Sequence, residues 1–138
     1  MSSLKPLFIL IYLLASPLLA YAQEAVDHKA YFVQIESIVR ANSFRSLGEH
    51  LFDKCEIKID ANRKEYSRSQ AEAVLKTFFQ ENSANKFDFV HNGKNGARDL
   101  IYAIGNYSTN TANYRLVIRA KKFEDTYKIF RIEFTKER

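Results

Sequence analysis

The chain has 138 residues, of which 46% are hydrophobic and 27% are charged, with 4 glycines, 2 prolines and 1 cysteine. This composition excludes the disordered, collagen-like and low-complexity classes, and one cysteine excludes an internal disulfide framework. The formal net charge of +5 is spread along the chain rather than gathered in a block. Such spacing is typical of a solvated surface and gives only weak support to an anionic partner.

The first 22 residues have the three-part layout of an export signal. Met1–Lys5 carries one positive charge, residues 6–19 are apolar apart from Ser16, and Ala20–Ala22 is a small-x-small cleavage site. The layout predicts a signal peptide at 1–22 rather than an uncleaved membrane helix, which is the alternative. We therefore expect a periplasmic or secreted protein that begins at Gln23 and has no membrane contact after cleavage.

Residues 23–138 show no repeat, linker or break in composition, so we expect a single domain there. The first half is predicted to be mainly helical and the second half stranded, which indicates the α+β class. The first helix is predicted at about 25–41, because Tyr31, Ile35 and Ile38 recur at three- and four-residue steps.

Two further helices are predicted from their caps and apolar faces. A short one follows Ser43, carries Phe44, Leu47 and Leu51 on one face, and closes at residues 53–54. The other starts at a capping box formed by Ser67 and Gln70 and ends at 82–85. Its apolar face consists of Ala71, Val74, Leu75, Phe78 and Phe79.

Alternation of apolar and polar residues predicts the strands. The first lies at 55–60, before a polar turn at 61–64 and a strand stub at 65–66. The later strands are predicted at 87–90, 98–109, 114–123 and 127–135, with turns at 91–96, 110–113 and 124–126. Their short connections predict antiparallel pairing in a curved sheet, with helices covering one face to form a cone with an open mouth.

Cys55 lies in this alternating pattern and is expected to face the core as a small hydrophobe. Two alternatives are an intermolecular disulfide and a thiol nucleophile paired with His50, five residues away. A lipid anchor is not expected, because lipid attachment needs a cysteine at the cleavage point.

Five short motifs stand out along the predicted elements. They are Tyr66-Ser67-x-x-Gln70-Ala71, Val74-Leu75-x-x-Phe78-Phe79, Phe87-x-x-x-His91-x-Gly93, Tyr102-Ala103-Ile104-Gly105 and Phe130-Arg131-Ile132-Glu133. The order of elements resembles the nuclear transport factor 2-like fold, and these motifs resemble those of one family of small secreted bacterial proteins. That family is classed as a domain of unknown function within this superfamily.

The resemblance implies a cone in which two or three N-terminal helices pack on a curved, mainly antiparallel sheet. It implies no particular activity, because the superfamily includes isomerases, dehydratases, hydrolases and non-catalytic binding proteins. Its members often pair through their sheets, so a homodimer is one expectation.

The candidate site residues are those that an apolar cone would hold near its mouth. We expect Tyr31, Tyr66, Tyr102, Tyr114 and His91 to line a pocket. Asp60 and Asp88 join them as groups for acid/base chemistry, but none matches a catalytic pattern, so no catalytic residue is assigned. The alternative is that the tyrosines fill the core and the acids face solvent.

No metal site and no cofactor are expected, because His28, His50 and His91 do not form a paired ligand motif. Arg115, Arg119 and Lys121 form a basic stripe on one strand face, to which Lys128 adds. The stripe is interpreted as a solvated outer sheet face or a dimer surface rather than a nucleic-acid site.

The leading prediction is a non-enzymatic module that binds a small apolar ligand or a protein partner. The alternative is a cofactor-free acid/base enzyme, and a third interpretation is a structural homodimer.

Overall fold

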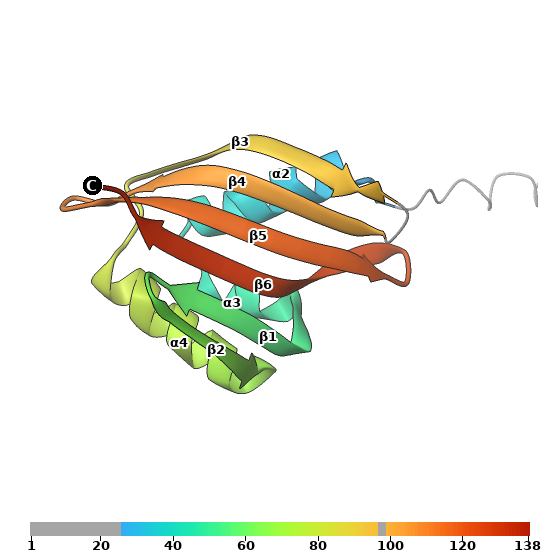
Figure 1. Ribbon diagram of the computed structural model, residues 1–138, viewed down its shortest axis with the longest axis horizontal. Helices are drawn as coiled ribbons and strands as arrows, with labels where there is room; N and C mark the ends of the chain where they lie inside the picture. The colour runs from blue at the N-terminus through green and yellow to red at the C-terminus, as the bar shows by residue number, and fades with distance from the viewer. Residues whose placement is uncertain (1–25, 97–98) are drawn as a thin grey trace, which may run out of the picture.

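The computed structural model describes residues 26–96 and 99–138 (Figure 1). The predicted signal peptide, its cleavage site and Arg98 lie outside these residues. The elements in chain order are α2 (His28–Arg40), α3 (Phe44–Glu49), β1 (Leu51–Ile59), β2 (Asn62–Ser67), α4 (Arg68–Glu81), β3 (Lys86–Asn95), β4 (Leu100–Ser108), β5 (Asn113–Phe123) and β6 (Thr126–Lys136).

All six strands form one curved sheet in the order β2-β1-β6-β5-β4-β3, with the three helices packed on it (Figure 1). Strands β3 to β6 pair antiparallel in sequence order, as the short connections predicted. Strand β1 pairs antiparallel with β2 and parallel with β6, so the sheet is mixed. The predicted α+β class and the expected helix-covered curved sheet are confirmed.

The caps set the helix starts. The Asp27 carboxylate accepts the Ala30 N–H at 2.7 Å, so α2 begins at His28, three residues later than predicted. Ser43 caps α3 as expected. The assignment of Leu51 to that helix is wrong, because the His50 carbonyl accepts the Ile129 N–H at 2.7 Å and Leu51 already pairs with β6.

The predicted turn at 61–64 is wrong, and the returning strand predicted at 65–66 is present but longer. The chain reverses at Asp60 and Ala61, with Asp60 at φ 53°, and β2 then runs for six residues. Residues 53–54, expected to close a helix, belong to β1. Backbone pairing needs no apolar side chains, so a charged edge strand carries little apolar signal in its sequence.

The capping box of α4 is confirmed: the Ser67 Oγ accepts the Gln70 N–H at 3.3 Å, and the Gln70 side chain accepts the Ser67 N–H at 3.2 Å. The helix buries Ala71, Leu75, Phe78 and Phe79.

The predicted hairpin turn at 91–96 is largely strand. β3 continues to Asn95, and His91 pairs with Ile104 after a bulge. Gly93 serves cross-strand packing here, since a Cβ on it would come within 3.0 Å of the Tyr102 hydroxyl. The residue at the turn is Gly96, whose φ of +56° glycine adopts without strain.

Aromatic side chains fill the space between the helices and the sheet. The rings of Phe78 from α4 and Phe134 from β6 lie 4.0 Å apart, and Tyr107 contacts both. Cys55 is buried in the same core, as predicted, and burial raises the pKa of its thiol to about 12. The described interior of the cone is therefore packed, and the hollows lie at its surface.

Candidate functional site

An apolar groove lies between α4 and the ends of two strands. Its volume is about 420 Å³. The lining residues are Ile59 of β1, Ala73, Val74, Thr77, Phe78 and Glu81 of α4, Asn82 just beyond the helix, and Tyr114 of β5. The helical spacing of Ala73, Val74 and Thr77 places these three side chains along one side of α4.

Polar groups gather where α4 ends. The Tyr114 hydroxyl donates to the Asn82 side-chain carbonyl at 3.2 Å, and the Asn82 amide donates to the Phe78 carbonyl at 3.3 Å. The buried Tyr107 hydroxyl donates to the Asn82 main-chain carbonyl. Burial raises the pKa of Tyr114, and the nearby Asp60 charge adds to this effect, so the phenol stays protonated and able to donate at neutral pH.

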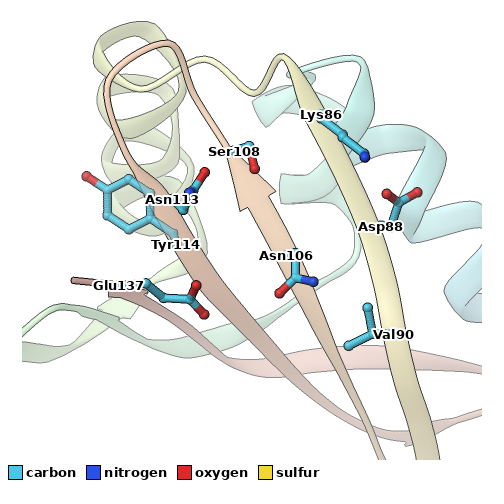
Figure 2. A pocket seen from close by; sticks show the side chains of 8 residues that line it. All are labelled: Lys86, Asp88, Val90, Asn106, Ser108, Asn113, Tyr114 and Glu137. Carbon is cyan, nitrogen blue, oxygen red and sulfur yellow. The ribbon is translucent and has the colours of Figure 1, made fainter.

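A second, polar hollow of about 340 Å³ lies beside the groove on the sheet (Figure 2). It is lined by Lys86, Asp88, Val90, Asn106, Ser108, Asn113, Tyr114 and Glu137. The ring of Tyr114 turns away from the other labelled side chains (Figure 2). Water competes well for polar groups such as these, so the apolar groove is the stronger candidate for a small molecule.

Side chains of α2 form hydrogen bonds with β3, which is an edge strand of the sheet. Arg40 donates from Nε to the Phe87 carbonyl at 2.7 Å and from Nη2 to the Asp88 carboxylate at 2.6 Å. The Glu36 carboxylate accepts the Phe89 N–H at 2.9 Å. These contacts bond two main-chain groups on the free edge of the sheet and engage Asp88, one of the two predicted acid/base carboxylates.

The predicted pocket residues are not gathered into one site. Tyr31 is fully buried, its ring contacts those of Tyr127 and His50, and its hydroxyl has no hydrogen-bond partner among the described residues. Burial raises the pKa of Tyr31 well above its usual value. Tyr66 lies on β2 beside the core, with the Lys64 ammonium 5.6 Å from its ring.

His91 and Tyr102 are brought together on the outer face of the sheet. His91 Nε2 and the Tyr102 hydroxyl are 2.9 Å apart, and the ring of Tyr102 leans over Gly93. His91 is exposed and Tyr102 half-buried, so this pair lies outside the cone. Of the five predicted residues, Tyr114 alone is among those that line the apolar groove.

Asn82, Glu81, Thr77 and Ile59 were not predicted as site residues. Asn82 was noted only as part of the helix end, and its role depends on two tyrosines from distant strands. The only local signal was an amide directly after an aromatic helix face, which is also a common way for a helix to end.

Residues 26–96 and 99–138 contain neither a metal-binding cluster nor a helix that could span a membrane. No group of three or more His, Cys, Asp or Glu residues there is arranged to hold a metal ion. No helix of the described chain is both long and apolar enough to cross a membrane.

Comparison with known proteins identifies the family. A family model described as "Domain of unknown function (DUF4783)" matches residues 32–135. The chain belongs to the DUF4783 family. No curated protein matches the sequence.

Solved structures of DUF4783 proteins share this fold. The Bacteroides ovatus protein is 21% identical, with a TM-score of 0.73, over 84% of this chain and 99% of its own. The Bacteroides fragilis protein is 26% identical, with a TM-score of 0.71, over 76% and 97%. An uncharacterised protein with a cystatin-like fold from Caulobacter vibrioides is 14% identical, with a TM-score of 0.60, over 80% and 87%. The fold of this DUF4783 chain is also similar to that of the structure described as "Rd1NTF2_04 with long sheet", which is 13% identical, with a TM-score of 0.62, over 78% of this chain and 99% of its own. The chain thus has the nuclear transport factor 2-like fold that the resemblance implied.

Proposed function

We propose that this DUF4783 protein is an exported, non-enzymatic binding module whose α4 groove takes a small apolar ligand. The groove itself is the observation that supports this. Its volume of about 420 Å³ lies within the roughly 300–1,000 Å³ typical of small-molecule sites. Val74, Phe78 and Ile59 offer apolar surface, and polar groups are concentrated at one end.

The polar end favours a ligand that carries a hydrogen-bond donor. Glu81 is negatively charged and lies in the last turn of α4, where the helix dipole also presents its negative end. Asn82 adds an amide carbonyl that already accepts from Tyr114. A hydroxyl or amine on the ligand suits these groups, whereas a carboxylate would meet electrostatic repulsion.

The acid/base enzyme alternative receives little support. The core contains no buried Asp, Glu or His within residues 26–96 and 99–138. His91 and Tyr102 form a hydrogen-bonded titratable pair, but the pair lies on the outer sheet face, away from the groove. General acid/base catalysis benefits from a group held in a water-poor site, which this surface does not offer.

The homodimer and protein-partner alternatives involve the outer face of the sheet. Ion pairs already occupy its β1–β6 side: Glu56 accepts Arg131 at 2.8 Å and Arg63 at 3.1 Å. A sheet-mediated dimer would have to cover these charged groups, so we keep it as a third proposal. Export is proposed from the layout of residues 1–22.

The ligand proposal is tested by titrating the purified protein with three probes that differ in one group: 1-naphthol, 1-naphthylmethylamine and 1-naphthoate. Backbone amide shifts in α4 report binding. We expect saturable binding of the alcohol and the amine, and no binding of the carboxylate.

Two matched variants locate the site. Ala73→Trp fills the groove and should abolish binding, whereas Lys76→Trp adds the same ring on the side of α4 that faces Phe44 and should leave binding intact. Equal binding by both variants, or binding of none of the probes, contradicts the proposal. Native mass spectrometry of the same samples separates a ligand-binding monomer from a ligand-free dimer.

A further inference from the structure

The outer face of β5 and β6 carries like charges directly opposite each other. Arg119 of β5 pairs in register with Arg131 of β6, and Lys121 pairs with Lys128 on the same two strands. Directly opposed side chains in a sheet lie about 5 Å apart, and like charges at this distance destabilise the pairing. Two such pairs in succession therefore place four cations on a small area.

Only one of these cations has an ion-pair partner among the residues that the structure describes. Arg131 donates from Nε to the Glu56 carboxylate at 2.8 Å. Arg119 has no carboxylate within ion-pair distance in this part of the chain, and its Nε has no hydrogen-bond acceptor there. Its positive charge is therefore left for an external anion to balance.

Aromatic rings position the two lysines. The Lys121 ammonium lies 4.7 Å from the centre of the Phe52 ring, and the Lys128 ammonium lies 4.2 Å from that of Phe123. The two rings contact each other edge to face, 5.8 Å apart. Cation–π contacts of this kind restrict the ammonium groups without neutralising them.

We propose that Arg119, Lys121, Lys128 and Arg131 form a site for the phosphate group of a small soluble ligand. A phosphate monoester carries a charge of about −1.5 to −2 and three acceptor oxygens, so it can accept from several cations at once. Arg119 and Lys121 are successive outward residues of β5, about 7 Å apart. Their partners on β6, Arg131 and Lys128, flank a bulge in that strand, so the four cations cover an area the size of one such group and its immediate attachment.

The surroundings favour a small ligand over a membrane. Glu124 and Asp125 lie at the tip of the β5–β6 hairpin, beyond the cations, whereas Glu56 and Glu133 are already paired with Arg131 and Arg63. An extended anionic surface would have to approach the two hairpin carboxylates. A single phosphate group avoids them.

The test is a titration of the purified protein with inorganic phosphate at pH 7, with sodium chloride at matched ionic strength as the blank. Arginine Nε–Hε NMR signals report on each guanidinium separately. We expect the Arg119 signal to shift and saturate with phosphate, while the signal of Arg115, which pairs with the neutral Thr135 on the same face, moves no more than in chloride.

Variants remove single charges from the same strands. Arg119→Gln and Lys128→Gln should each weaken phosphate binding about tenfold, the effect of losing one charge-assisted hydrogen bond, as reported by the Lys121 amide. Arg115→Gln is the matched control and should bind as the wild type does. Neither binding variant should unfold, because each relieves a like-charge contact, and thermal melts check this. Shifts no larger than in chloride, or equal weakening by Arg115→Gln, overturn the proposal.

A vesicle experiment separates the two sources of phosphate. Vesicles of phosphatidylglycerol should not sediment the protein at physiological ionic strength. Sedimentation that Arg119→Gln abolishes would overturn the small-ligand proposal in favour of a membrane headgroup.

Discussion

Individual tyrosines have different roles that their sequence neighbours do not distinguish. Tyr31 contributes its whole side chain to the core, whereas Tyr114 reaches the surface at the polar end of the groove. Tyr102 covers Gly93 on the outer face. All three were predicted as pocket residues because members of the resembled superfamily hold such groups inside an apolar cone. Burial depends on which helix or strand lies opposite, and only the folded chain determines this.

The lowered pKa of His50 makes the free energy of unfolding depend on pH. Burial lowers the pKa of His50, the Lys128 charge lowers it further, and Glu49 partly opposes the shift. The unfolded chain therefore protonates this residue at higher pH than the folded chain does. The free energy of unfolding should fall as the pH drops below about 6.5, the ordinary value for histidine.

Urea unfolding at about pH 7.5 and pH 5 measures this loss, and His50→Gln should reduce it. His91→Gln, which changes an exposed ring, serves as the control. A loss in His50→Gln as large as in the wild type would assign the pH dependence to other groups.

Helices were predicted more accurately than strands because their signals are local. Periodicity and caps lie within one segment, so α4 and its capping box were predicted directly from residues 67–82. β2 and the second half of β3 carry weak alternation and are ordered by pairing with β1 and β4. Gly93 and Asn95 indicated a turn, but their partners Tyr102 and Leu100 hold them in a strand.

The capping box gives a prediction at this scale. Ser67→Ala removes the acceptor for the Gln70 N–H and should lower the free energy of unfolding by about 1 kcal/mol. Gln80→Ala, at an exposed position of the same helix, should cost nothing because alanine has the higher helix propensity. Chemical denaturation of both variants measures the difference, and equal stability would mean that Ser67 contributes no net capping energy.

The molecule as a whole is held together by one aromatic core that joins α4 to the strands. Phe134 contacts Phe78, Phe79, Tyr107 and Tyr114. These rings come from a helix and three strands, and they pack the core formed by the described residues. The candidate sites therefore lie on the surface, as a groove beside α4 and a charged face on β5 and β6.

Phe134→Ala tests whether the helices and the sheet around this core unfold in one cooperative transition. Removing a fully buried phenylalanine typically costs about 3–5 kcal/mol, and far-UV circular dichroism and tyrosine fluorescence should report the same lowered urea midpoint. Val33→Ala, at a position 70% exposed on α2, should leave the midpoint nearly unchanged. Separate midpoints for the two probes would show that the helices and the sheet unfold independently.

Local patterns in the sequence were enough to predict the α+β class, the three helices of the described residues, the antiparallel order of the last four strands and the burial of Cys55. These follow from periodicity, caps and short connections, all of which act over a few residues. Three features could be seen only in the folded chain: β1 runs parallel to β6, Asn82 contacts Tyr107 and Tyr114, and Arg119 lies opposite Arg131. Such contacts join segments that are far apart along the chain, and their register depends on how all six strands pair.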